Sequence, residues 1–305
     1  MSRRPSTRDS NLSWDESREA FQDRGHRHAR KPPRRRSVSA LLSENQTDYQ
    51  VEEHVKFDDP GLQELFERGL IVDLLWELKS GKEATVYVVE GKDGIAAAKL
   101  YIDSRVRSFK DDSLYRGSRF IGDKRIQKAI ELRSRTGVSA QNILWVQEEF
   151  SQMHALQQYG VPVPRPIALA EAGNVILMEF IGDENGAAPR LSDTKLTKTQ
   201  AEDAWRQSVR NMGLILGAGR VHGDYSTFNI LWWQERCVVI DFPQVVLVQE
   251  NPSANMILER DVAGLCRSFG HFGLHPDPVE TLKEVRRVAR EIQIAKPSEE
   301  LALVL

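Results

Sequence analysis

The chain has 305 residues, of which 40% are hydrophobic and 28% are charged, with a formal net charge of −2. This length allows one large domain or two lobes with a substantial core, and the composition is ordinary for a globular protein. No apolar run is long enough to span a bilayer, no signal-peptide pattern opens the chain, and two cysteines cannot form a disulfide framework. We therefore expect no membrane partner and a cytoplasmic location.

The first 40 residues differ in charge from the rest of the chain. They contain ten Arg and one Lys against five acidic residues, a local charge of +6 that leaves −8 for the remainder. Because this segment is also rich in Ser and Pro and poor in apolar residues, it predicts a disordered basic tail over residues 1–55. Such a tail is suited to binding RNA or another polyanion by counterion release, and a solvated leader is the alternative.

The next segment predicts one short helix followed by a hairpin. Asp59-Pro60 is suited to capping a helix over residues 61–68. Two β-rich runs, 71–78 and 84–89, flank a short polar turn and predict the hairpin. Gly81 lies in that turn, where a glycine lets backbone N–H groups approach an anion closely.

A single lysine, Lys99, stands inside the following apolar strand, residues 95–101. A lysine among small apolar residues is costly unless its ammonium reaches a partner, and snorkelling from a strand edge is the alternative. The candidate partner is Glu149, on the inner side of a helix predicted over 145–158. Glu148 lies about 100° away on the helical wheel and is expected to face solvent. We interpret Lys99 as a phosphate-binding lysine held by a carboxylate.

The middle of the chain predicts an insertion and then a linker. A charged, weakly periodic stretch near residues 104–140 predicts a flexible insertion. The buried strand predicted at 175–181 runs into an interlobe linker, where backbone groups of Glu179 and Ile181 are placed to bond an adenine edge. A helix predicted over 201–216 then supports the loop that follows it.

The stretch Val221–Val245 carries the clearest chemical pattern. Asp224 precedes Asn229 by five residues, so one tight loop can hold a proton acceptor and an amide oxygen for a hard cation. The apolar run 237–240 predicts a buried strand that delivers Asp241 to the same point. Two carboxylates and an amide oxygen suit Mg²⁺, with Mn²⁺ as the alternative cation, and predict a phosphoryl-transfer site. For the loop alone, the alternative is a surface turn followed by a core strand.

Several motifs follow one another at kinase-like spacing between residues 70 and 270. They are S-G-K-E-A-T-V-Y at 80–87, A-K-L-Y at 98–101, E-E-F at 148–150, P-V-P-R-P at 162–166, M-E-F-I-G at 178–182, H-G-D-Y-S-T-F-N at 222–229, I-D-F-P-Q at 240–244 and E-R-D-V at 259–262. Together they resemble the motifs of the RIO kinases, a family of atypical serine/threonine protein kinases.

The resemblance implies an α+β fold of the two-lobed protein-kinase type. The β-rich N-lobe is expected over residues 56–181, and a reduced, mainly helical C-lobe over 182–305. Only 64 residues follow Asp241 and none of them forms an A-P-E motif, which leaves no room for the peptide-docking part of a typical protein kinase. A charged amphipathic helix predicted over 279–294 is expected to pack beneath the catalytic loop.

The resemblance also implies roles for individual residues and ATP as the bound nucleotide. Asp224 is expected to be the catalytic base, and Asn229 and Asp241 the metal ligands. Asp241 has a second expected role, because the family's metal-binding aspartate is linked to an aspartyl-phosphate intermediate. The expected nucleotide-site residues are Ser80, Gly81, Lys82, Val86, Lys99, Glu149, Glu179 and Ile181.

Two alternatives to a protein kinase use the same chemistry. The first is an ATPase switch in small-ribosomal-subunit assembly, since family members are associated with maturation of that particle and the basic tail suits RNA. The second is a small-molecule phosphotransferase of the aminoglycoside or choline kinase type, which shares H-G-D-x-x-x-x-N and I-D. The chain departs from one RIO branch because too few residues that are expected to be ordered precede the first strand for its winged-helix domain, although I-D-F-P-Q resembles that branch.

Overall fold

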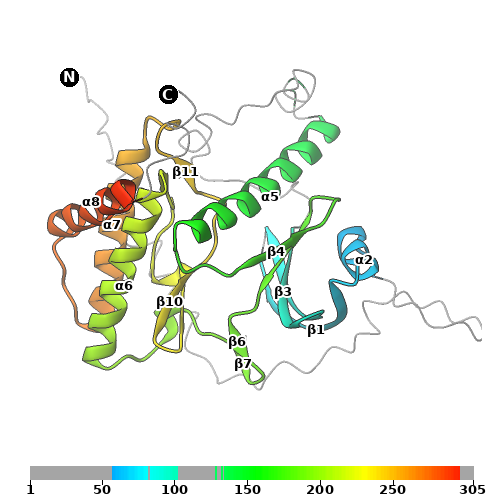
Figure 1. Ribbon diagram of the computed structural model, residues 1–305, viewed down its shortest axis with the longest axis horizontal. Coiled ribbons are helices and arrows are strands. Elements are labelled where there is room, and N and C mark those ends of the chain that lie inside the picture. The colour runs from blue at the N-terminus through cyan, green and yellow to red at the C-terminus, as the bar shows by residue number, and fades with distance from the viewer. Residues whose placement is uncertain (1–56, 82, 102–127, 129–131, 133, 296–305) are drawn as a thin grey trace, which may run out of the picture. The chain divides into compact units, whose positions relative to one another are not determined.

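The computed structural model describes residues 57–81, 83–101, 128, 132 and 134–295, all within one compact unit of the chain (Figure 1). The predicted tail over residues 1–55 and Lys82 lie outside the described residues. So does most of the predicted insertion near 104–140.

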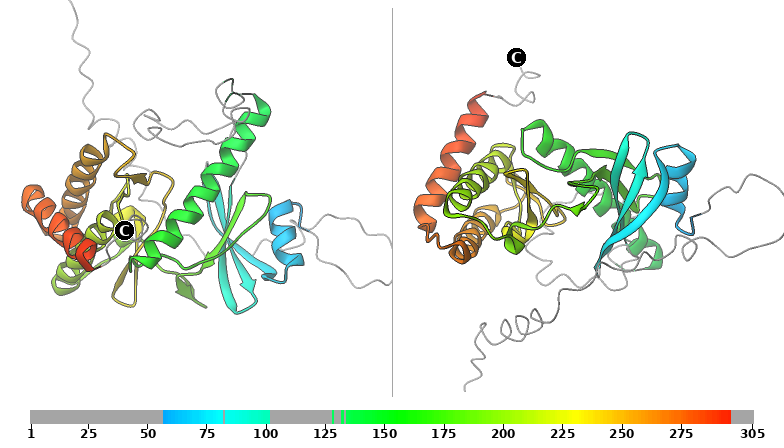
Figure 2. Two further views of the ribbon diagram at one scale, coloured as in Figure 1. Left: turned by 45° about the horizontal axis from the view of Figure 1, so that its top comes forward. Right: turned by 90° about the horizontal axis from the view of Figure 1, so that it is seen from below.

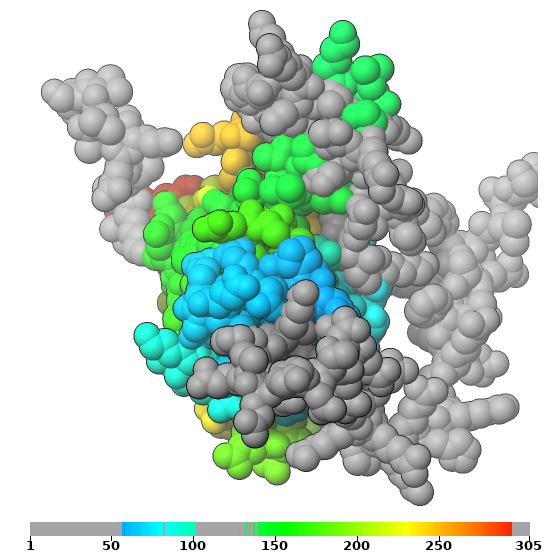
Figure 3. Space-filling model, turned by 90° about the vertical axis from the view of Figure 1, so that its right-hand side faces the viewer, coloured from blue at the N-terminus to red at the C-terminus, as the bar shows by residue number. Residues whose placement is uncertain are grey.

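A short helix and a five-stranded antiparallel sheet form the N-terminal half. Helix α2 (Pro60–Glu67) begins where predicted, because Oδ1 of Asp59 accepts the N–H groups of Gly61 at 2.8 Å and Leu62 at 3.0 Å. This helix is part of the surface seen in Figure 3, where it is blue, and its apolar side packs on the sheet. The strand order is β1-β2-β3-β5-β4, so the strand that holds Lys99 is central. The strands are β1 (Ile71–Ser80), β2 (Ala84–Gly91), β3 (Gly94–Tyr101), β4 (Pro166–Leu169) and β5 (Val175–Glu179).

Helix α5 (Arg135–Gln158) is longer than the sequence predicted. It begins at Arg135, inside the stretch expected to be an insertion, where the hydroxyl of Ser134 accepts the N–H of Gly137 at 3.1 Å. Its early turns, with the sequence R-T-G-V-S-A-Q, lack the apolar periodicity on which the prediction rested. Val146 and Met153 enter the core of the helical half, while the helix also contacts β4 and β5 (Figure 2).

Three helices and several short strands build the C-terminal half. The sequence correctly predicted α6 and the strand before Asp241. The strand expected to run to Ile181 stops at Glu179 instead, and a hairpin of two very short strands follows it. The elements are β6 (Gly182–Asp183), β7 (Gly186–Ala187), η3 (Leu191–Asp193), α6 (Lys198–Gly217), β8 (Arg220–Val221), η4 (Thr227–Asn229), β9 (Ile230–Trp233), β10 (Arg236–Val239), β11 (Val246–Leu247), α7 (Ala254–Phe269), η5 (Gly270–Phe272) and α8 (Pro278–Ala295).

The last helix packs mainly against two other helices. Helix α8 lies along α6 and also contacts α7, rather than packing beneath the loop as expected. Gly213 and Gly217 of α6 allow this approach, since a Cβ there would lie 2.5 Å from Val288 and 2.9 Å from Ile292. Two glycines one turn apart therefore decide where α8 packs.

The larger hydrophobic core crosses the expected lobe boundary between residues 181 and 182. Val146 and Leu156 of α5 pack in the same cluster as Ile215 of α6 and Leu265 of α7. The observed arrangement is α+β, with a β-rich N-terminal half and a mainly helical C-terminal half, as predicted. Among the described helices, none is both long and apolar enough to cross a membrane.

Candidate functional site

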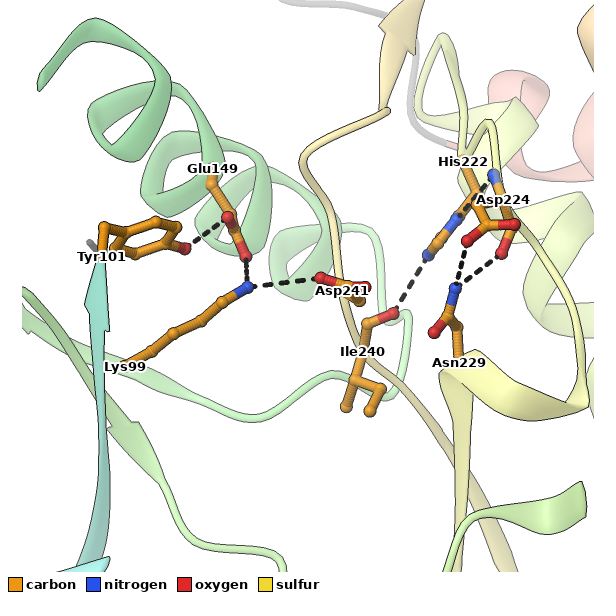
Figure 4. A network of polar contacts seen from close by, with 8 residues as sticks. All are labelled: Lys99, Tyr101, Glu149, His222, Asp224, Asn229, Ile240 and Asp241. Atoms are coloured by element: carbon orange, nitrogen blue, oxygen red, sulfur yellow. Dashed lines mark hydrogen bonds and ion pairs between the residues drawn. The ribbon is translucent and has the colours of Figure 1, made fainter. Parts of the chain in front are cut away.

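Lys99 and Glu149 form the ion pair that the sequence predicted. Nζ of Lys99 lies 2.6 Å from Oε1 of Glu149, and the hydroxyl of Tyr101 donates to the other carboxylate oxygen (Figure 4). The exposed fractions are 14% for the lysine side chain and 4% for the glutamate, which excludes a snorkelling edge lysine. Burial opposes the charge on Lys99, but the Glu149 carboxylate outweighs it and raises the lysine pKa well above its usual value.

Asp241 is the second carboxylate that Lys99 contacts. The distance from Nζ of Lys99 to Oδ1 of Asp241 is 3.3 Å, although 142 residues separate them in the chain. Desolvation opposes ionisation of Asp241, but the ammonium of Lys99 outweighs it and lowers the aspartate pKa. Asp241 also has φ of +70°, a left-handed conformation that a non-glycine residue rarely adopts and that is concentrated at functional sites. The strand before it therefore delivers an ionised carboxylate to the lysine.

Asp224 and Asn229 close one tight loop, as predicted. The Nδ2 group of Asn229 donates to both the backbone oxygen and Oδ2 of Asp224, each at 2.9 Å. The amide oxygen of Asn229 is thereby turned away from Asp224 (Figure 4). Desolvation raises the pKa of Asp224 in spite of the Asn229 hydrogen bond, so this carboxylate is a stronger base than an ordinary aspartate.

His222 joins the loop to the strand that carries Asp241, a role the sequence motif did not reveal. Its Nδ1 accepts the N–H of Asp224 at 3.3 Å, and its Nε2 lies 3.2 Å from the carbonyl of Ile240. Burial lowers the pKa of His222 to about 4, so the ring is neutral near pH 7. With Nδ1 accepting, the proton is on Nε2 and is donated to Ile240. The ring therefore links the backbone of Asp224 to that of Ile240, the residue before Asp241.

Asp261 of α7 holds the backbone of the same loop. Its Oδ2 accepts the N–H of Gly223 at 2.8 Å, and Arg260 donates to the Gly223 carbonyl. Gly223 has φ of +85°, and a Cβ there would lie 2.3 Å from the backbone oxygen of Gln244, so no other residue fits. Burial raises the pKa of Asp261 to about 7. The E-R-D-V motif marked these residues in the sequence without indicating this contact.

A chain of polar contacts also ties α5 to β8. Glu148 does not face open solvent as expected, because it is half-buried and accepts a hydrogen bond from Gln152. The buried Gln152 in turn accepts from Nε of Arg220 in β8. Because Gln152 lies one turn from Glu149, this contact links the ion-pair helix to the strand that leads into the loop of residues 222–229.

The neutral His222 predicts a specific loss of stability in acid. The folded-state pKa of about 4 lies below the ordinary 6.5. The neutral His222 ring therefore contributes fully to the free energy of unfolding above pH 6.5, and this contribution is lost as the pH falls towards 4. The loss between pH 7 and pH 5 should be about 2 kcal/mol. Urea unfolding of wild type and His222→Gln at both pH values should show this extra loss only in wild type. The exposed His275, changed to Gln, is the control and should keep the wild-type behaviour. Equal losses in wild type and His222→Gln would contradict the assignment.

Ser80, Gly81 and Val86, which are expected at a nucleotide, lie in the β1–β2 hairpin. Val86 is the register partner of Lys99 across β2 and β3, so both side chains face the same side of the sheet. The hydroxyl of Ser80 lies 3.0 Å from that of Thr85. The N–H of Gly81, expected to approach an anion, instead donates to the carbonyl of Ala84 at 2.9 Å and closes the hairpin. Backbone pairing between the strands has used this donor.

The linker residues each use one backbone group within the protein. The N–H of Glu179 donates to the carbonyl of Arg165, and the carbonyl of Ile181 accepts the N–H of Ala188, both at 2.8 Å. The Glu179 carbonyl and the Ile181 N–H would therefore be the groups that contact an adenine edge. These are one acceptor and one donor, which is the pair that an adenine amino group and ring nitrogen require.

The oxygen groups of Asp241 and Asn229 suit a cation shared with phosphates. Across the described part of the chain, no cluster of three or more His, Cys, Asp or Glu side chains is arranged to hold a metal alone. Asp241 and the amide oxygen of Asn229 offer hard oxygen ligands, but fewer than a complete coordination shell. Mg²⁺ accepts such incomplete protein sites because it keeps waters and shares phosphate oxygens. The residues therefore fit Mg²⁺ brought together with a nucleotide.

The chain is similar to proteins of one family. The RIO domain family model matches residues 85–282. The chain is 30% identical over 269 residues to the RIO-type serine/threonine-protein kinase Rio1 of Haloferax volcanii, covering 87% of each chain. It is 28% identical over 258 residues to the serine/threonine-protein kinase RIO1 of Caenorhabditis elegans, covering 79% of this chain and 48% of that relative. The chain thus spans about half the length of the Caenorhabditis protein.

Solved structures agree with the fold. One is the Rio2 kinase of Chaetomium thermophilum in an ADP/Mg²⁺-phosphoaspartate complex, with a TM-score of 0.55 and 22% identity over 79% of this chain and 71% of that chain. Another structure of the same kinase gives a TM-score of 0.53 at 22% identity, covering 87% and 81%. At this identity the likeness concerns the fold, and it confirms the predicted two-lobed protein-kinase architecture.

Proposed function

The chain belongs to the RIO family, and from that premise we propose that it is an atypical serine/threonine protein kinase that transfers the terminal phosphate of ATP. The observation that carries the proposal is Lys99, whose ammonium lies 2.6 Å from Glu149 and 3.3 Å from Asp241. A kinase requires a lysine for the phosphates, a carboxylate to hold it and a carboxylate for the metal. Three distant parts of the chain supply these groups at one point.

Each group has a distinct proposed task. Lys99 binds the phosphates of ATP, and Glu149 holds the lysine in place. Asp224, with its raised pKa, accepts the proton of the attacking hydroxyl. Asn229 keeps Asp224 oriented through its amide nitrogen and offers its oxygen to a cation. Glu179 and Ile181 are proposed to hold the adenine edge, and Val86 to pack beside it on the face it shares with Lys99.

Mg²⁺, or Mn²⁺, bound through Asp241 and Asn229 would neutralise charge between the β- and γ-phosphates. Its fit rests on the ionised Asp241 carboxylate and the outward amide oxygen of Asn229. Asp241 is also the candidate to accept a phosphoryl group, as the phosphoaspartate of the Chaetomium Rio2 complex suggests. The small-molecule phosphotransferase alternative is not favoured, because the relatives described above are RIO protein kinases.

The metal assignment predicts that Asp241→Asn weakens ATP binding only when Mg²⁺ is present. The loss should be about 10- to 100-fold, the range for a charge-assisted contact of about 1.5–3 kcal/mol. With EDTA in place of Mg²⁺, the variant should bind ATP at least as well as wild type, because one negative charge near the phosphates is gone. Calorimetry of both proteins in both buffers measures this difference.

The matched control is Asp203→Asn, which changes a partly exposed aspartate on α6 and should leave both affinities unchanged. Equal Mg²⁺-ATP affinity in folded Asp241→Asn would refute the metal role.

Terminally labelled ATP, given to the protein alone and with small-subunit particles, then identifies the product. Phosphoserine or phosphothreonine supports the proposed kinase, whereas free phosphate alone would replace it with an ATPase switch. Hydroxylamine-sensitive label lost in Asp241→Asn would identify the acyl phosphate.

A further inference from the structure

Tyr101 contacts both members of the ion pair. It follows Lys99 by two residues in β3, so the two side chains lie on the same face of the sheet. The Lys99 ammonium lies 5.2 Å from the centre of the Tyr101 ring, and the Tyr101 hydroxyl donates to Oε2 of Glu149 (Figure 4). The phenol is therefore fixed against the lysine by its ring and against the glutamate by its hydroxyl.

The two oxygens of Glu149 have different partners. Lys99 occupies Oε1, and the hydroxyl of Tyr101 occupies Oε2. The glutamate side chain is only 4% exposed, so water cannot readily replace a lost donor. A buried carboxylate oxygen without a donor costs free energy, and rotation about the last side-chain bond would relieve that cost. Such a rotation would carry Oε1 away from the lysine.

We propose that Tyr101 is a positioning residue for phosphoryl transfer, whose hydroxyl holds the Glu149 carboxylate in the orientation that presents Lys99 to the phosphates. This inference rests on the proposed kinase function. In this arrangement Tyr101 acts on the lysine through Glu149. Burial and the neighbouring Glu149 charge raise the tyrosine pKa well above its usual value, so the hydroxyl stays a donor over the working pH range.

The ring and the hydroxyl of Tyr101 have separable roles. The ring packs against the larger core and faces the lysine, and phenylalanine would preserve both contacts. Tyr101→Phe therefore removes the hydrogen bond to Glu149 while keeping the packing. Tyr87 is the matched control, because it lies on the neighbouring strand β2, opposite Ala98, with its ring half-buried against the smaller core.

The experiment measures kcat, the KM for ATP and the thermal unfolding midpoint of the full chain. Tyr101→Phe should lose about 10- to 100-fold in kcat/KM, the fold-change that corresponds to one hydrogen bond to a charged group. Its unfolding midpoint should stay within a few degrees of wild type. Tyr87→Phe should keep wild-type kinetics. A Tyr101→Phe enzyme with wild-type kinetics would overturn the inference, provided that wild type itself transfers phosphate.

A second measurement separates positioning from general packing. In Glu149→Gln the carboxylate is gone, so adding Tyr101→Phe should cost less than about threefold more. An equal loss in both backgrounds would show that the hydroxyl acts independently of Glu149 and would refute the proposal. If wild type shows no transfer under any condition, the proposed function fails first. If only the inference about Tyr101 fails, wild type will transfer phosphate and Tyr101→Phe will keep the wild-type kcat/KM.

Discussion

Lys99→Met should reduce phosphoryl transfer to background, and Glu149→Ala should remove much of the rate. Methionine keeps the length and apolar stem of the lysine but has no charge for the phosphates or for Asp241. Alanine leaves the lysine without the contact that holds it 2.6 Å from Oε1. Single-turnover transfer of labelled phosphate from ATP measures both losses. Lys92→Met, which changes an exposed lysine in the turn between β2 and β3, should retain wild-type turnover.

The stability of these variants needs a separate control. Removing Lys99 leaves the buried Glu149 charge with Tyr101 as its remaining donor, and breaking a buried ion pair costs about 3–5 kcal/mol. Replacing both members with apolar residues, as in Lys99→Met/Glu149→Leu, should restore much of that stability while transfer stays at background. A folded double variant with substantial activity would remove the ion pair from the mechanism. Full activity in Glu149→Ala would show that the glutamate is not needed for phosphoryl transfer.

Asp224→Asn should lower turnover by about 10²–10⁴-fold, the usual contribution of general base catalysis, while ATP affinity stays near wild type. The loss would be smaller if positioning and metal electrostatics supply most of the acceleration. Asparagine keeps the shape of the side chain, and its amide oxygen can still accept from Nδ2 of Asn229, so the loop should stay closed. Calorimetric ATP affinity and single-turnover transfer on one preparation separate chemistry from binding.

The pH profile gives an independent measure of the same group. Transfer needs Asp224 deprotonated, so the rate should fall as the pH drops through its pKa. Because desolvation raises that pKa, the acid limb should lie above the ordinary aspartate range. The limb should disappear in Asp224→Asn but persist in Asp203→Asn. A folded Asp224→Asn protein with full turnover and an unchanged acid limb would leave Asp224 without a catalytic role.

Local patterns in the sequence were sufficient to predict much of the fold. The cap at Asp59, the hairpin around Gly81 and the strand that contains Lys99 each depend on residues close together in the chain. The spacing of Asp224 and Asn229 also predicts their contact, because five residues are enough to close the loop. These features follow from turn chemistry and side-chain periodicity, which act over a few residues.

Other features depended on long-range packing and were missed. The early turns of α5 have no apolar periodicity, so their helical state depends on the cap at Ser134 and on the packing of later turns. The N–H of Gly81 was expected at an anion, yet strand pairing commits it to Ala84. The role of His222 needs a carbonyl from another strand, and that of Tyr101 needs a carboxylate from another helix.

Residue types and spacing therefore determined which groups could perform phosphoryl transfer, whereas tertiary structure decided how these groups meet. Lys99 and Asp241 are 142 positions apart, and only the joint packing of sheet, α5 and catalytic loop brings them to 3.3 Å. The shifted pKa values of His222 and Asp261 arise in the same way, because both depend on burial by elements distant in sequence. The sequence determines which side chains are present, but their burial and the distances between them depend on how the whole chain packs.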